Sequence, residues 1–237
     1  MRRPNNQPPK NRSGRPRYQN RRFDIDEFVE TIGNDYHSWK PPVVTFIANR
    51  GVTPFQVLVS TLLSLRTKDE VTAVAAESLF KKARTPSELL KLGESRIRKL
   101  IYPVGFYPTK AKRLVEISHI IIDKHNGQVP DDMETLLELP GVGRKTANLV
   151  LVEGFQQEAI CVDTHVHRIS NRVGYVRTTT PEKTEFALRK KLPRKYWIHY
   201  NEMLVAFGQM ICRPISPFCS RCPVNDMCPA IGVDKHR

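Results

Sequence analysis

Lys145 and Asp163 have the residue types and the setting for nucleophilic and acid–base chemistry. Lys145 lies in the stretch LPGVGRKTAN, and Asp163 lies in VDTH, eighteen residues later. Lys145 falls in the first turn of a predicted helix, where the helix dipole and burial both favour the neutral, nucleophilic amine. Asp163 precedes a short amphipathic run, which predicts a helix N-cap. The alternatives are a phosphate-contacting or solvated lysine and a purely structural cap.

The glycines before Lys145 predict how this lysine is presented. Gly141 and Gly143, on either side of Val142, interrupt two helical patterns too closely for an ordinary loop, which indicates a tight hairpin. The next helix begins at about Arg144. Because its first N–H groups have no partner within the helix, they form a site for phosphate.

Other basic residues near these two motifs are candidate phosphate contacts. Arg144, Arg168 and Arg172 each fit such a contact, with an ordinary surface charge as the alternative. His165, two residues after Asp163, is expected to pack or to orient a neighbour rather than to catalyse.

Four of the five cysteines form a metal-site pattern. They are spaced C-x6-C-x2-C-x5-C, at Cys212, Cys219, Cys222 and Cys228. A zinc site made of cysteines more often uses two C-x2-C pairs, whereas one contiguous cysteine-rich loop fits an iron–sulfur cluster. We therefore expect a cluster, with zinc as the alternative. Cys161 stands apart and is expected to be buried.

The elements that position these residues are predicted to be helices. Apolar residues recur at helical spacing, and no convincing alternation of period two is present, so the chain is predicted to be all-α. Capping signals at Thr53, Thr85 and Thr180 mark helix starts, and Gly93 and Gly127 mark helix ends. Helices are expected over 23–39, from 53, over 69–82, 85–93, 94–100 and 109–125, from 131 or 132, and over 180–191 and 196–210.

The charge balance points to a polyanionic partner. The chain has 38 Lys and Arg against 24 Asp and Glu, for a net charge of +14. Eight of the basic residues lie in residues 1–22, which contain no acid; the remainder carries 30 against 24, or +6. Residues 1–22 are predicted to be a disordered basic tail that slides along nucleic acid or serves only to solubilise the chain. No membrane span or secretory signal is visible, so a cytoplasmic, nucleoid-associated location is expected.

Together, LPGVGRKTAN, VDTH and the four-cysteine pattern resemble the endonuclease III family of DNA base-excision glycosylases, in the helix-hairpin-helix/Gly-Pro-Asp superfamily. The resemblance covers about residues 23–229. It implies two all-α lobes: a six-helix barrel with the helix-hairpin-helix at about 47–157, and a lobe formed by 23–46 and 158–237 around a [4Fe-4S] cluster. It also implies a monomer that binds double-stranded DNA containing damaged bases or abasic sites.

The resemblance implies a bifunctional DNA glycosylase and AP lyase. Such an enzyme excises oxidised pyrimidines and nicks the strand by β-elimination. Lys145 matches the family's nucleophile and Asp163 its second catalytic residue, and the four cysteines match the cluster ligands. The residues expected to contact DNA are Gly141, Val142, Gly143, Arg144 and His165.

Two positions depart from the family pattern. Arg66 stands where the family often has Gln, and Phe106 stands where it often has Leu; these residues fill the gap left by the extruded base and wedge the opposite strand. Residues 102–105 and the following helix faintly repeat the hairpin pattern. Arg66 and Phe106 are each expected to lie in a corner loop between helices. We expect both residues to keep the gap-filling role.

Three other functions are considered. An adenine glycosylase with the same cluster would lack a lysine at position 145 and would carry a catalytic Glu in the helix before Arg66, where residues 55–66 contain no carboxylate. Thymine glycosylases specific for mismatches also tend to replace the lysine. The third alternative is a non-catalytic DNA-binding module that uses only the hairpin and the basic tail.

Overall fold

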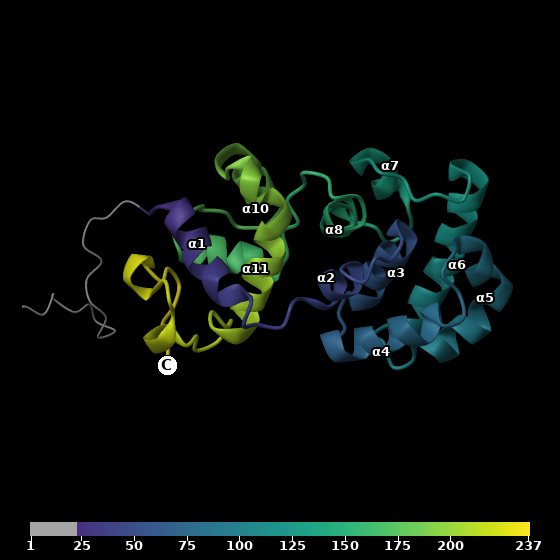
Figure 1. Ribbon diagram of the computed structural model, residues 1–237, viewed down its shortest axis with the longest axis horizontal. Coiled ribbons are helices and arrows are strands. Elements are labelled where there is room, and N and C mark those ends of the chain that lie inside the picture. The colour runs from purple at the N-terminus through teal and green to yellow at the C-terminus, as the bar shows by residue number, and fades with distance from the viewer. Residues whose placement is uncertain (1–22) are drawn as a thin grey trace, which may run out of the picture. The chain divides into compact units, whose positions relative to one another are not determined.

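A computed structural model describes residues 23–237, and every regular element in this range is a helix (Figure 1). The predicted all-α fold class is therefore confirmed. The predicted basic tail, residues 1–22, lies outside the described residues. None of the described helices combines the length and the apolar content needed to cross a bilayer.

The helices follow one another with short connections. The α-helices are α1 (Ile25–Tyr36), α2 (Val43–Ala48), α3 (Pro54–Ser64), α4 (Asp69–Phe80), α5 (Pro86–Ile101), α6 (Tyr107–His125), α7 (Met133–Glu138), α8 (Arg144–Phe155), α9 (Thr164–Arg172), α10 (Pro181–Lys191) and α11 (Trp197–Met210). Three short 3-10 helices are η1 (Arg194–Tyr196), η2 (Cys219–Arg221) and η3 (Asn225–Met227).

The chain forms two compact units, each made of segments that are distant in sequence. The first unit contains residues 162–192 and 203–237 together with the described residues up to 40, and the second contains 41–161 and 193–202. The predicted barrel region, 47–157, lies inside the second unit.

The second unit is built around α3, the most buried of its helices. Every residue of α3 from Phe55 to Leu63 is buried, because the helix packs against α2, α4, α6 and α8. Thr53 caps its N-terminus in a capping box with Gln56, as the sequence predicts. Gly93 has a left-handed backbone (φ 72°), so the predicted end of a helix there is a kink within α5.

Helix α2 was not predicted from the sequence. The expected helices leave residues 40–52 unassigned, whereas Pro42 is the N-cap residue of α2. Val43, Val44 and Ile47 are buried. A helix of six residues is too short for periodicity to reveal, and tertiary burial stabilises it instead.

The first unit contains α1, α9, α10, the second half of α11 and the cysteine loop that follows α11. Aromatic side chains form part of its core: the Phe207 ring stacks on Trp39 at 5.8 Å and meets Phe28 edge-on at 6.5 Å. The Tyr175 hydroxyl donates to the backbone oxygen of Lys191 at 2.8 Å, and the Lys191 ammonium donates to the backbone oxygen of Tyr175 at 2.6 Å. These contacts join α10 to the turn after α9.

Glu153 is a largely buried carboxylate on α8. Burial is the main cause that raises its pKa to about 7, and the nearby charge of Glu202 acts in the same direction. A hydrogen bond from the Thr45 hydroxyl and the nearby His199 act in the opposite direction. Glu153 therefore holds a proton in the folded chain over a pH range in which the unfolded chain has lost it.

Replacing Glu153 by Gln should change how stability depends on pH. The pKa of Glu153 rises from 4.5 to about 7 on folding, so its charge costs stability progressively as pH rises through that window. The free energy of unfolding of Glu153→Gln, relative to wild type, should therefore increase between pH 4.5 and 8 by up to about 3 kcal/mol. Denaturant unfolding at several pH values measures this difference. Glu158→Gln is the control, because Glu158 is half exposed and paired with Arg194; parallel curves for Glu153→Gln and wild type would contradict the prediction.

Candidate functional site

The predicted hairpin is present between α7 and α8. Gly141 has φ 81°, a conformation that favours glycine. A Cβ atom at this position would also lie 2.8 Å from Nη1 of Arg113. Val142 is buried, and its N–H donates to the backbone oxygen of Leu139 at 3.0 Å. The turn is therefore anchored by its apolar residue, while its two glycines are exposed.

The N-terminus of α8 has no side-chain cap. Its N-cap residue, Gly143, offers no hydrogen-bonding side chain, and the first helical bond runs from the Ala147 N–H to the Gly143 oxygen at 2.9 Å. No acidic side chain lies in the first turn. Such a helix end attracts an anion through its N–H groups and its dipole.

Lys145 lies half-buried in the first turn of α8. Its backbone oxygen is 3.5 Å from the Cys161 sulfur, and Cys161 is buried as predicted. Within residues 23–237, no hydrogen bond or ion pair engages the Lys145 amine. In the described chain, the Lys145 amine is therefore not held in place by a structural hydrogen bond or ion pair.

Asp163 is the N-cap of α9, which confirms the structural part of its prediction. One carboxylate oxygen, Oδ1, accepts hydrogen bonds from the N–H groups of His165 at 2.8 Å and Val166 at 2.9 Å. The negative charge of Asp163 also acts on the Arg168 guanidinium. Its orientation is fixed by the cap, so the second oxygen is held in a defined direction.

His165 packs closely against α11, as expected from its position. Its Nδ1 atom lies 3.1 Å from Nη2 of Arg168, and any side chain at position 208 would collide with the imidazole. Gly208 is therefore needed for this contact. Nη2 of Arg168 also donates to the backbone oxygen of Cys212 at 2.8 Å.

Both expectations for Arg172, a phosphate contact and an ordinary surface charge, are wrong. The side chain is only 8% exposed, and its guanidinium donates to the backbone oxygens of Arg213 and Pro214, both at 2.6 Å. Nη1 also lies 3.6 Å from the Cys212 sulfur. No pattern in the sequence indicates this role of Arg172, because its partners lie about forty residues away.

The four cysteines of the C-terminal motif line one largely apolar cavity. Burial, together with the nearby Cys228, Cys212 and Cys219, raises the pKa of Cys222 to about 12, so the four sulfurs lie near one another. In the part of the chain that the structure describes, no three His, Cys, Asp or Glu side chains are close enough to hold a single metal ion.

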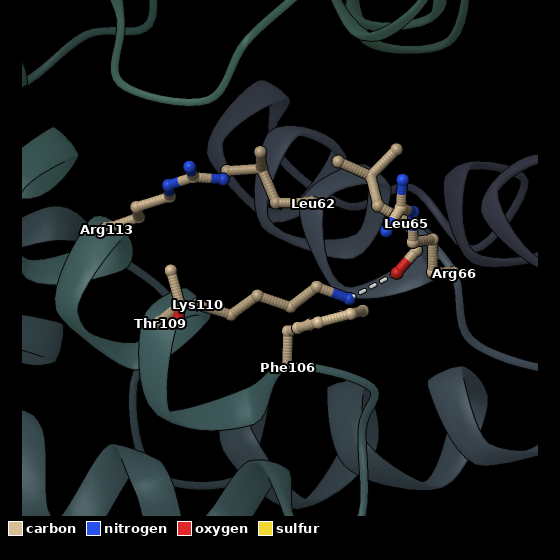
Figure 2. A pocket seen from close by; sticks show the side chains of 7 residues that line it. All are labelled: Leu62, Leu65, Arg66, Phe106, Thr109, Lys110 and Arg113. Carbon is tan, nitrogen blue, oxygen red and sulfur yellow. Dashed lines mark hydrogen bonds between the residues drawn. The ribbon is translucent and has the colours of Figure 1, made fainter.

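The structure brings Arg66 and Phe106 together from two separate loops. Both residues have left-handed backbones, with φ 53° and φ 58°, which is uncommon outside glycine and concentrates at functional sites. The Arg66 guanidinium lies 5.6 Å from the centre of the Phe106 ring, and the ring is 61% exposed. Both line a cavity of about 380 Å³, shown in Figure 2.

Lys110 is a buried residue of the same cavity that was not predicted from the sequence. Its side chain is 7% exposed, it lines the same cavity, and burial lowers its pKa to about 8. The available signal was its position: Lys110, Leu114, Ile117 and Ile121 follow the spacing of the buried face of α6. A lysine within an apolar stripe indicates a specific role for its charge.

Comparison with known proteins assigns the chain to a family. The family described as "HhH-GPD superfamily base excision DNA repair protein" matches residues 59–194. Endonuclease III of Thermotoga maritima is 53% identical over 175 residues, which cover 74% of this chain and 82% of that protein.

Two solved structures of endonuclease III with DNA are also similar. A non-covalent complex superposes with a TM-score of 0.78 at 32% identity, covering 87% of this chain and 94% of the other. A trapped covalent intermediate, described as an estranged-adenine complex, superposes with a TM-score of 0.71 at 36% identity, covering 75% and 84%. The chain therefore belongs to the endonuclease III family of the HhH-GPD superfamily, whose members are base excision DNA glycosylases.

Proposed function

We propose that Lys145 is the nucleophile of this DNA glycosylase and AP lyase, and that its substrates are oxidised pyrimidines in duplex DNA. The observation that carries the proposal is an amine with no structural partner in the described chain, one residue inside the uncapped N-terminus of α8. The same helix end binds phosphate in this proposal, so the hairpin and Arg144 grip the backbone of the strand that Lys145 attacks.

The proposed reaction needs a neutral lysine and an extruded nucleotide. The damaged base is rotated out of the duplex, which costs about a few kcal/mol and less for a poorly stacked lesion. The Lys145 amine then attacks the sugar C1′, the glycosidic bond breaks, and the base leaves with the bonding electrons and takes up a proton. Loss of a proton from the amine and ring opening give a Schiff base. Removal of the C2′ proton then expels the 3′ phosphate and nicks the strand.

Asp163 is proposed as the second catalytic residue. Its carboxylate supports positive charge that develops on the sugar, or accepts and returns a proton. The cap hydrogen bonds to α9 hold it in one orientation, as electrostatic stabilisation of a transition state requires. His165 and the hairpin residues are proposed to contact the DNA around it.

The adenine glycosylase alternative finds no support in the helix before Arg66. That alternative needs a carboxylate there, and α3 contains none. The non-catalytic alternative predicts no covalent adduct with DNA, so a trapping experiment separates it from our proposal.

Lys145→Ala and Lys145→Gln should abolish covalent trapping. Borohydride reduces a Schiff base to a stable amine, so wild type should form an adduct with a duplex containing an oxidised pyrimidine, and the variants should lose it by at least about a hundredfold. Denaturing gel electrophoresis measures the adduct. Lys81→Ala is the control, because Lys81 is exposed and pairs with Glu77 on the same helix. An undiminished adduct in the Lys145 variants would refute the lyase proposal.

Two substitutions of Asp163 should separate its cap from its chemistry. Asn is a good N-cap, so Asp163→Asn should keep the thermal stability of wild type, whereas Asp163→Ala should lose about 0.5–2 kcal/mol. Both should slow base release strongly in single-turnover assays, since both remove the charge. If Asp163→Asn releases the base at the wild-type rate, Asp163 has only its capping role.

We also propose that the four cysteines hold a [4Fe-4S] cluster. All four cysteines line one cavity, and their spacing in a single contiguous loop fits the four thiolates that a cluster needs. Arg172 supports the loop between the first two cysteines from within the fold. When bound, the cluster neutralises the thiolates and fixes the loop; we assign it no step in base excision.

Iron and sulfide analysis tests this metal centre. Anaerobically purified protein should be brown and contain about four iron atoms per chain. Cys222→Ser should lose iron and stability together, because its thiol is buried beside the other three. Cys161→Ser should retain full iron content, because Cys161 does not line the cavity of the other four cysteines. A colourless protein with one zinc ion would overturn the assignment.

Arg66 and Phe106 are proposed to fill the gap left by the extruded nucleotide. Their proximity and the exposure of the Phe106 ring support this role, since an exposed aromatic ring can stack between bases and a guanidinium can pair with a base edge.

A further inference from the structure

The loops that carry Arg66 and Phe106 meet backbone to backbone. The first loop follows α3, and the second precedes α6. A side chain at Gly105 would collide with the backbone oxygen of Arg66, so the two chains touch at this point. The Gly105 N–H donates to the Thr67 hydroxyl at 3.2 Å. Two residues in an uncommon backbone conformation are thus held beside each other by contacts between loops.

Lys110 connects these loops from within. Its ammonium donates to the backbone oxygens of Leu63 at 2.8 Å and Leu65 at 2.6 Å, and to the Thr67 hydroxyl at 3.2 Å. Figure 2 shows the side chain reaching from α6 to the backbone of Leu65, with Phe106 at the base of the same helix. The same Thr67 hydroxyl accepts from Gly105, so one ammonium links α6, the end of α3 and both loops.

The bonding of Lys110 uses the full capacity of an ammonium group. A protonated lysine has three donors, and all three are engaged. Leu63 and Leu65 lie at the C-terminal end of α3, where the helix dipole favours a cation. No carboxylate pairs with Lys110 within the described chain. A buried cation without a counter-ion is costly, so an apolar side chain would serve better if packing alone were required.

We propose that Lys110 is a positioning residue that holds Arg66 and Phe106 together as one wedge for DNA. The inference rests on the proposed gap-filling role of those two residues. Lys110 itself touches no DNA in this scheme. It sets the conformation of both loops before DNA binds, so that less ordering is required when the wedge enters the duplex.

The contact between the two loops should also depend on the protonation state of Lys110. Burial lowers its pKa to about 8. The other charged residues around the cavity are Arg66 and Arg113, both cations. A neutral amine has two donors, so above pH 8 one of the three acceptors loses its hydrogen bond. The contact between the loops should therefore loosen as pH rises through about 8.

The experiment uses a duplex with a tetrahydrofuran abasic analogue opposite 2-aminopurine, together with an intact duplex of matched sequence. The analogue cannot react with Lys145, so binding is measured without cleavage. Entry of the wedge unstacks 2-aminopurine and raises its fluorescence. Lys110→Met should weaken binding to the abasic duplex by about tenfold more than binding to intact DNA, the worth of a charged hydrogen bond, and should suppress the fluorescence rise. Lys112→Met is the matched control, because Lys112 is 69% exposed on the same helix.

Further variants separate the possible failures. Arg66→Ala and Phe106→Ala should lose the same selectivity; if they keep it, the gap-filling role is wrong. If they lose it while Lys110→Met keeps both selectivity and fluorescence, only the positioning role is wrong. Equal losses on both duplexes, as expected from charge alone, would also overturn it. Because the abasic analogue does not react with Lys145, the test is independent of the proposed nucleophile.

A pH series keeps the inference testable if Lys110→Met does not fold. The fluorescence rise of wild type on the abasic duplex should decline with a midpoint near pH 8. Lys110→Arg retains a permanent cation with several donors, so its smaller signal should stay flat to pH 9.5. A wild-type signal that does not change across pH 8 would contradict the role of the ammonium.

Discussion

Backbone groups at the ends of a helix have no partner within the helix, and this constraint locates the functional residues of the chain. Lys145 follows the uncapped start of α8, Asp163 caps α9, Phe106 is the N-cap residue of α6, and Arg66 follows the end of α3. At each of these positions the backbone must find a partner outside the helix. The partner is a side chain in some cases and, as we propose, DNA phosphate in another.

Three of these helix ends differ in what meets their free backbone groups. The end of α9 is closed by a carboxylate, which is thereby oriented. The end of α8 is left open by Gly143, so its donors and dipole remain for an anion. The end of α3 is closed by the ammonium of Lys110, which arrives from α6. The same physical requirement thus orients an acid, presents an anion site and joins two loops.

The backbone of the cysteine loop also needs hydrogen-bond partners, although residues 213 and 214 lie outside any helix. Residues 213 and 214 belong to no regular element, so their backbone oxygens need partners. Arg172 supplies them from the last residue of α9, with a planar guanidinium that can meet two oxygens at once. Helix α9 is capped by Asp163 at its N-terminus, and its last residue, Arg172, supports the proposed cluster loop. Helix α9 and this loop both belong to the first unit.

The sequence by itself determined the features that depend on neighbours along the chain. The helical class, the hairpin at Gly141 and Gly143 and the caps at Thr53 and Asp163 were all predicted, because each is set by a few consecutive residues. Only the tertiary structure revealed the contacts of Arg172, Glu153 and Lys110. Their partners lie between about 40 and 110 residues away, and burial of a charged group becomes visible only when those partners are in place. Helix α2 was missed for the same reason, since burial against distant residues stabilises it.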